Sequence, residues 1–342
     1  MFSSFWRWFQ DIQPVSTTGT VSHTYYWLKT LMSGDIVYYN PNFKIPDTAE
    51  PSLRKGIAIY CVHGTADQPG SFSRIVERLI EKGLPDYVST IHLVSFEHRY
   101  AGKGIKYFAR ELIKKIGANE HEQVILMGHS RGGLVISRAA EYLAARSGIT
   151  VHALFSICAP YKGSDWAMKP LSLFSISVAQ MEVKAELLEQ LNKAVSDSKH
   201  DYHFIGAAED AIVAPSASYV DDYVKTHPGS RLILDRHGHL SIMSSRRLVT
   251  YIHQKLIEID HQLFPKVQKE NKEYEEDDSL SESSYTNSYY FKYLRSNCFN
   301  FSSSCHCNLA FSLVLINFKQ SELCQFSHGL TGLAFAALSQ RL

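Results

Sequence analysis

One serine stands in a segment whose spacing is suited to nucleophilic chemistry. Ser130 has glycines two positions before and after it, in the run Gly128-His129-Ser130-Arg131-Gly132-Gly133. An apolar stretch at 124–127 precedes this run, and a helical pattern begins at Leu134. A serine hydroxyl is a weak nucleophile, so it needs a base to accept its proton and a third group to orient that base. The spacing predicts a nucleophilic serine on a sharp strand-to-helix turn, although an ordinary serine in a glycine-rich turn has the same signature.

A carboxylate that could orient the base follows the predicted strand 201–206. Asp210 is our candidate for this role, because it lies on a loop at the end of a strand and between the serine and the histidines in chain order. Three nearby carboxylates remain as alternatives: Glu209, Asp221 and Asp222.

The base is predicted from the segment that follows a second late strand, 231–234. His239 comes after Gly238, which leaves the backbone free to present the ring, and a helical pattern follows it. We therefore predict that His239 is the base and that His237 is a polar loop residue.

Acyl transfer also requires hydrogen-bond donors where the oxyanion forms. The backbone N–H of Arg131, directly after the serine, is one candidate donor. The other is the backbone N–H of Thr65, in the turn that follows the predicted strand 57–62. His63 in the same turn is predicted to be a structural, hydrogen-bonded loop residue.

These residues need a scaffold of alternating strands and helices. Besides the strands named above, apolar runs predict strands at 35–39, 91–96 and 151–157, and stripes at helical spacing predict helices at 20–34, 72–82, 105–116, 134–147 and from 241 onward. Such alternation is typical of βαβ units, so we expect an α/β protein with a mostly parallel sheet and helices on both faces.

Taken together, residues 56–262 resemble the serine α/β-hydrolases of the lipase and esterase group. The resemblance rests on the serine segment and on four further motifs: His63-Gly64-Thr65, Ala159-Pro160-Tyr161-Lys162-Gly163-Ser164, Asp210 with Ile212-Val213, and Gly238-His239-Leu240. It implies the α/β-hydrolase fold with a short cap segment, and a catalytic triad of Ser130, Asp210 and His239. Arg131 departs from the pattern, because many lipases carry an apolar residue at that position.

Four segments are predicted from changes in composition. An aromatic-rich N-terminal extension covers 1–55, the catalytic domain 56–264, an acidic linker 265–284 and a tail of unknown role 285–342. The tail contains Cys298, Cys305, His306, Cys307 and Cys324, but their spacing lacks the paired C-x-x-C units of zinc sites, so we expect neither a metal nor a cofactor.

Charge and cysteine usage restrict the partners and the compartment. The formal net charge is +1, which does not favour nucleic acid. The cysteines do not have the spacing of a disulfide scaffold, so a reducing, cytoplasmic location is expected. Phe2, Phe5, Trp6 and Phe9 form an aromatic stripe at helical spacing, which predicts either packing onto the hydrolase body or peripheral membrane contact through residues 1–16.

The expected activity is hydrolysis of a small-molecule or lipid carboxylic ester through an acyl-enzyme. An apolar stretch between Ser164 and His200 could cap the site and accept an acyl chain, or it could simply cover the sheet. A thioesterase or lipid acyltransferase with the same triad is the alternative within this class. A non-catalytic hydrolase-fold module that binds membrane or protein is the alternative outside it. The sequence does not indicate the oligomeric state.

Overall fold

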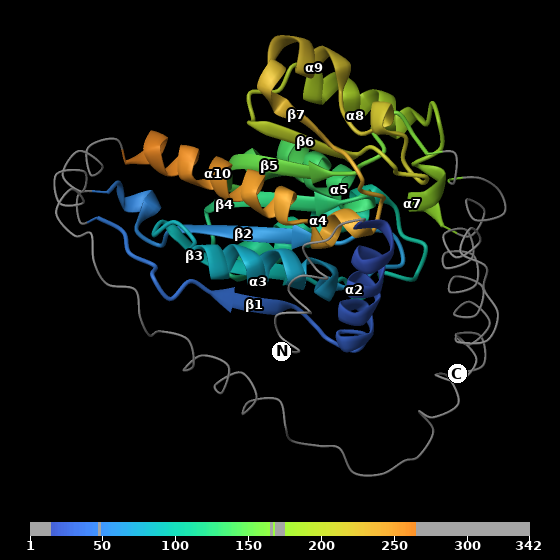
Figure 1. Ribbon diagram of the computed structural model, residues 1–342. Coiled ribbons are helices and arrows are strands. Elements are labelled where there is room, and N and C mark those ends of the chain that lie inside the picture. The colour runs from blue at the N-terminus through green and yellow to red at the C-terminus, as the bar shows by residue number, and fades with distance from the viewer. Residues whose placement is uncertain (1–14, 47–48, 165–166, 168–174, 265–342) are drawn as a thin grey trace, which may run out of the picture. The chain divides into compact units, whose positions relative to one another are not determined.

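The computed structural model describes residues 15–46, 49–164, 167 and 175–264 (Figure 1). The predictions for the N-terminal aromatic stripe, the acidic linker and the tail cysteines lie outside these residues, as does part of the predicted cap segment.

A mostly parallel sheet forms the centre of the described part of the chain (Figure 1). Its strands lie side by side in the order β1-β3-β2-β4-β5-β6-β7. β1 pairs antiparallel with β3, and every other pair is parallel. The strands are β1 (Ile36–Tyr39), β2 (Ile57–Val62), β3 (Val88–Val94), β4 (Gln123–His129), β5 (Thr150–Ile157), β6 (Tyr202–Ala207) and β7 (Arg231–Leu234).

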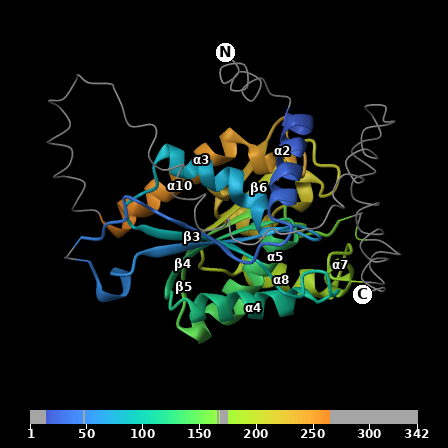
Figure 2. The same ribbon diagram turned by 90° about the horizontal axis from the view of Figure 1, so that it is seen from below.

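Helices cover both faces of this sheet, as Figure 2 shows from below. α3 (Ser73–Lys82) and α10 (Arg246–Leu263) pack on one face. The opposite face carries α4 (Ile105–Ala118), α5 (Arg131–Ala139), α8 (Glu186–Ser196) and α9 (Asp221–Thr226). The remaining described α-helices are α2 (Val15–Lys29) and α7 (Ile176–Ala179).

β2 illustrates why the sheet is buried between two layers. All six of its residues are buried, with Tyr60 in the core on the α4 side and Ile59 in the core on the α3 side. Successive side chains of a strand point to opposite faces, so a strand covered on both sides requires a continuous apolar run instead of an alternating one. The run Ile57–Val62 meets this requirement.

The residues before position 56 contribute to the same folded unit. β1 forms an edge of the sheet through its pairing with β3. α2 packs against two short 3-10 helices, η2 (Pro69–Phe72) and η7 (Ser241–Ser244). The segment that composition set apart as an extension therefore supplies a strand of the sheet and a helix that packs on the same folded unit.

The stretch predicted to cap the site divides into two parts. Leu187, Leu188 and Leu191 of α8 are buried in the core on the α4 and α5 side of the sheet. For α8, the simpler expectation that it covers the sheet is therefore correct. α7 lies earlier in the same stretch and exposes Ile176, which is 59% accessible.

Strand order, the parallel pairing and the two helical layers together are those of an α/β-hydrolase fold, as the sequence predicts. Within the described residues, we find no helix long and apolar enough to cross a membrane.

Candidate active site

Ser130 lies on a strained turn between β4 and α5. Its backbone has φ 55° and ψ −125°, a combination that side-chain-bearing residues rarely adopt. The Ser130 N–H donates to the carbonyl of Ile157 at 2.8 Å, which ties the turn to the end of β5. Strain of this kind persists only where the surrounding structure imposes it, and it commonly marks a functional site.

The glycines around Ser130 are required because backbone segments approach very closely there. A Cβ at Gly128 would lie 2.4 Å from the carbonyl oxygen of Gly132. A Cβ at Gly132 would lie 2.0 Å from the carbonyl oxygen of Val62, and one at Gly133 would lie 2.4 Å from the Cβ of Ala159. All three positions therefore exclude a side chain, which explains the glycine spacing noted in the sequence.

Asp210 and His239 form a buried hydrogen-bonded pair. Nδ1 of His239 lies 2.8 Å from Oδ2 of Asp210, and the two residues are 7% and 8% exposed. Oδ1 of Asp210 accepts the backbone N–H groups of Ile212 and Val213, each at 2.8 Å. Burial raises the pKa of Asp210, but the attraction of His239 and these two donors outweigh it, and the pKa is lowered overall. Asp210 is therefore an ionised carboxylate that fixes the orientation of the imidazole.

The alternative acids are exposed, two of them paired with lysines, and the alternative base makes a hydrogen bond within its own loop. Glu209 is exposed, Asp221 pairs with Lys162 at 2.9 Å, and Asp222 pairs with Lys225 at 2.8 Å. The ring of His237 hydrogen-bonds through Nδ1 to the carbonyl oxygen of Asp235 at 2.6 Å, within its own loop.

His129 connects the serine turn to His239. Its Nε2–H donates to the backbone carbonyl of His239 at 2.9 Å, and the two rings have centroids 4.8 Å apart. In the described part of the chain, no hydrogen bond joins Oγ of Ser130 to Nε2 of His239. Such bonds are often long before substrate binds and shorten in the reacting complex.

The two candidate oxyanion donors are the backbone N–H groups of Thr65 and Arg131. The turn after β2 passes directly over the serine, since a Cβ at Gly64 would lie 3.1 Å from Cβ of Ser130. Among the described residues, neither Thr65 nor Arg131 donates its backbone N–H to another group. His63 beside them is buried and bonds through Nδ1 to the carbonyl of Gly64 at 3.0 Å, and burial lowers its pKa to about 4.

The side chain of Arg131 extends into the protein interior instead of into solvent. It is 2% exposed and donates to the carbonyl of Gly64 at 3.1 Å and to Oγ of Ser177 at 3.3 Å. Its guanidinium lies 4.3 Å from the centre of the Phe108 ring. Burial lowers the pKa of Arg131 to about 10, so the group remains charged at neutral pH.

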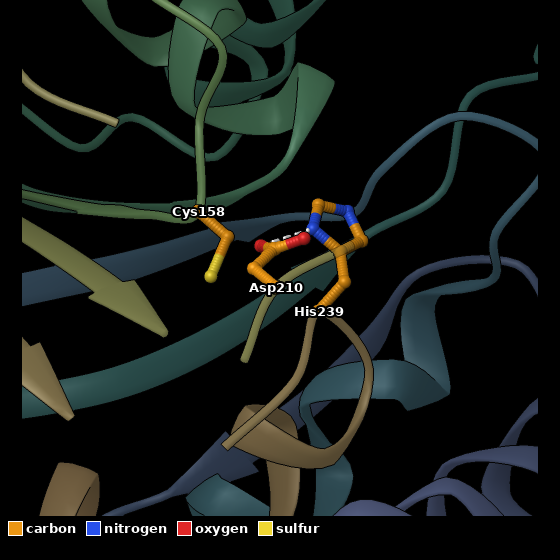
Figure 3. A group of neighbouring side chains, drawn as sticks. All are labelled: Cys158, Asp210 and His239. Atoms are coloured by element: carbon orange, nitrogen blue, oxygen red, sulfur yellow. Dashed lines mark hydrogen bonds and ion pairs between the residues drawn. The ribbon is translucent and has the colours of Figure 1, made fainter. Parts of the chain in front are cut away.

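Cys158 is a neighbour of the pair that the sequence did not mark as functional (Figure 3). Its thiol and the ring and carboxylate of His239 and Asp210 offer ligand atoms within 4.8 Å of one another. Both Asp210 oxygens already accept hydrogen bonds, and burial raises the pKa of the Cys158 thiol well above its usual range. Because metals bind the thiolate, these residues fit a hydrogen-bonded pair with a protonated thiol beside it better than a metal site.

His129 also belongs to a second group of histidine and aspartate, which it forms with Asp67 and His23. Asp67 is buried, with Oδ1 3.4 Å from Nε2 of His23 and Oδ2 3.9 Å from Nδ1 of His129. Burial raises the pKa of Asp67, but the nearby His23 and the other histidines outweigh it and hold the pKa well below its usual value. Nothing in the local sequence marks this group, because its members come from α2, the turn after β2 and the end of β4.

Comparisons with known proteins find similarity in structure only. No family model matches the chain, and no curated protein matches its sequence. An α/β-hydrolase enzyme from the metagenome of lagoon sediments at Mar Chica, Morocco, is 18% identical, with a TM-score of 0.46 over 66% of this chain and 95% of that one. A Bacillus licheniformis lipase is 13% identical, with a TM-score of 0.44 over 65% of this chain and 98% of that one. An esterase from Thermogutta terrifontis is 14% identical, with a TM-score of 0.42 over 60% and 90%.

Proposed function

We propose that this protein is a serine hydrolase that cleaves carboxylic esters through a covalent acyl-enzyme. The observation that carries the proposal is the strained turn at Ser130 and its link to a hydrogen-bonded pair. His129, next to Ser130, donates to the backbone carbonyl of His239, and the ring of His239 is oriented by the buried carboxylate of Asp210. A glycine-rich turn with an ordinary serine does not require this arrangement. The esterase and lipase activities named for the similar structures agree with the proposal.

The proposed reaction has two halves. Oγ of Ser130 attacks the ester carbonyl carbon while Nε2 of His239 takes the hydroxyl proton, and the N–H groups of Thr65 and Arg131 receive the oxyanion. The tetrahedral species collapses, and the leaving alcohol takes the proton from His239. Water then attacks the acyl-enzyme, giving its proton to His239, and the carboxylic acid leaves as Oγ regains a proton. Asp210 stays ionised and stabilises the imidazolium that forms in each half.

Covalent labelling tests the nucleophile directly. A fluorophosphonate probe should label the wild-type protein and fail to label Ser130→Ala. Persistent labelling of Ser130→Ala would overturn the assignment of the nucleophile.

A pair of histidine variants tests the base. Hydrolysis of p-nitrophenyl esters should be lost in His239→Asn and largely retained in His237→Asn. His237 is the matched control, because it lies in the same loop as His239 and is also buried. If His237→Asn lost activity while His239→Asn kept it, the base would be His237.

The acyl group is tested by varying its length. Turnover across p-nitrophenyl esters from two to sixteen carbons, together with matching thioesters, separates a short-chain esterase from a lipase or a thioesterase. We expect oxygen esters to be hydrolysed. Turnover of thioesters alone would reassign the protein to the thioesterase alternative.

A further inference from the structure

Arg131 is a buried cation that the reaction proposed above does not use through its side chain. The residue is 2% exposed, and no carboxylate of the described chain lies within ion-pair distance of it. Its Nε atom is buried, and it has no hydrogen-bond partner among the described residues. Burial lowers the pKa of Arg131 and the charge of Asp67 raises it, but no direct ion pair joins the two residues in the described part of the chain. A buried charge without a direct ion pair is costly to a fold, so the position of Arg131 beside the nucleophile requires an explanation.

Of the two hydrogen bonds that the guanidinium makes among the described residues, one is made to a peptide group beside the nucleophile and the other to Oγ of Ser177. One nitrogen of the guanidinium donates to the carbonyl oxygen of Gly64 at 3.1 Å. The guanidinium carbon lies over the face of the Phe108 ring, 4.3 Å from its centre, and an aromatic face attracts a cation. The carbonyl of Gly64 and the N–H of Thr65 belong to the same peptide. Arg131 therefore holds a positive charge at one end of the peptide whose other end is the candidate oxyanion donor.

A hydrogen bond accepted by a peptide carbonyl polarises that peptide and strengthens the N–H at its opposite end. The effect is larger where water is excluded, as it is around Gly64, which is buried. The backbone N–H of Arg131 is itself the second candidate donor. Arg131 thus acts on both candidate donors: it supplies one through its own backbone N–H, and its side chain polarises the peptide that carries the other, the N–H of Thr65.

We propose that the Arg131 side chain is a positioning residue that orients and polarises the Gly64–Thr65 peptide for oxyanion stabilisation. This inference rests on the proposed function, because it assigns Arg131 to the same site and the same step. It predicts that Arg131 stabilises the transition state and contributes little to the binding of unreacted ester.

Three substitutions of Arg131 separate charge from hydrogen bonding. Arg131→Lys keeps a charge, Arg131→Gln keeps a neutral donor, and Arg131→Met keeps only the length. We expect kcat to fall in the order Arg, Lys, Gln, Met, with a loss of about tenfold to a hundredfold in the Met variant, below the about 10²–10³ that follows outright removal of an oxyanion donor. KM should change little, because the lost interaction is one made in the transition state.

Inhibitor binding gives a readout that general loosening of the fold would not produce. A trifluoromethyl ketone that adds to Ser130 forms an oxyanion, whereas the matching methyl ketone binds largely as the neutral carbonyl. Across the variants, affinity for the trifluoromethyl ketone should fall in proportion to kcat/KM, while affinity for the methyl ketone stays constant.

Ser177→Ala is the matched control. It removes the hydrogen bond from Arg131 to Ser177, which is equally buried, and leaves the contact with Gly64 in place. Its kcat should stay near that of the wild type. If Arg131→Met does not fold, the comparison of kcat between Arg131→Lys and Arg131→Gln tests the role of the charge, since both variants retain a polar donor of similar reach.

The outcomes separate the two proposals. Wild-type kcat in Arg131→Met or Arg131→Gln, or equal losses for both ketones, would overturn the role of Arg131 and leave the serine hydrolase intact. A wild-type protein that neither reacts with fluorophosphonate nor hydrolyses any ester would overturn the proposed function and the role of Arg131 with it.

Discussion

His129 contacts two buried groups of histidine and aspartate: the pair Asp210 and His239, and the group that it forms itself with Asp67 and His23. The two groups contain the same residue types, but only the first is joined by a hydrogen bond between carboxylate and imidazole at normal length. In the pair Asp210 and His239, donor faces acceptor at 2.8 Å, and both carboxylate oxygens are satisfied. In the group around Asp67, its carboxylate lies 3.4 Å from Nε2 of His23 and 3.9 Å from Nδ1 of His129. Within the described part of the chain, Oδ2 of Asp67 and Nδ1 of His129 have no hydrogen-bond partner.

The tautomer of His129 accounts for the missing hydrogen bond between its ring and Asp67. Its Nε2–H is donated to the carbonyl of His239, and burial lowers its pKa to about 3, so the ring is neutral and Nδ1 carries a lone pair. That lone pair faces a carboxylate, which also offers only lone pairs. Burial and residue type are therefore not sufficient to make a hydrogen-bonded histidine and aspartate pair, because the proton must lie between the two partners.

The largest effect on kcat is expected at the pair Asp210 and His239. Asp210→Asn should keep the fold but lower kcat by about 10⁴, because an amide cannot hold the histidine in the required tautomer. Steady-state hydrolysis of p-nitrophenyl esters measures this loss, and circular dichroism checks the fold. Activity within tenfold of the wild type would mean that another carboxylate orients His239, and Asp221→Asn serves as the exposed control.

A smaller effect, on stability instead of on chemistry, is expected at Asp67. Asp67→Asn should lower the free energy of unfolding at pH 7 by about 1–3 kcal/mol, since it removes the buried charge that His23 stabilises. Because the folded-state pKa of Asp67 is depressed, ionised Asp67 stabilises the fold above the unfolded-state pKa of about 3.9, and this contribution is lost as the pH falls through the folded-state pKa.

Denaturant titrations from pH 7 to pH 3 measure this difference. The difference in unfolding free energy between the wild type and Asp67→Asn should stay constant down to about pH 4 and narrow below it, since the unfolded-state pKa is about 3.9. A constant gap across that range would show that Asp67 stabilises the fold through its shape and hydrogen bonds instead of its charge.

The smallest effect is expected at His23. His23→Asn should lower the free energy of unfolding by about 1 kcal/mol, as expected for one modest polar contact, and leave kcat within a few-fold of the wild type. Thermal melts and ester hydrolysis on the same preparation measure both quantities. A loss of kcat as large as that in Asp210→Asn would show that the two groups act as one unit.

The sequence predicts the fold and the first pair because their signals are local. The glycine spacing around Ser130 is dictated by backbone approaches within one turn, and β7 is found at its predicted residues 231–234. The final helix is predicted from Ser241, whereas the chain first forms η7 and begins α10 at Arg246. Ser245 accounts for that start, because its side chain accepts the N–H of Leu248 as an N-cap.

The second group is not predicted because its members are distant in sequence. His23 lies in a segment whose composition suggested a separate extension, and neither Asp67 nor His129 belongs to a motif of its own. Likewise, the sequence marks Arg131 as an exception to the lipase pattern, but only the packing shows that its side chain reaches Gly64. Long-range packing carries no periodicity, so sequence patterns do not report it.

The contact between α2 and η7 has a consequence for how the chain folds. Gly19 is so close to Ser241 that a Cβ there would lie 2.6 Å from the serine Cβ, and Oγ of Ser244 donates to the carbonyl of Gly19. On the ribosome α2 and one of its partners, η2, are made before most of the sheet, but its other partner, η7, is made only after β7, the last described strand. Contacts of such high sequence separation form late and slow the folding rate. We therefore expect α2 to dock in the last phase of folding, after the strand that leads to His239 has left the ribosome.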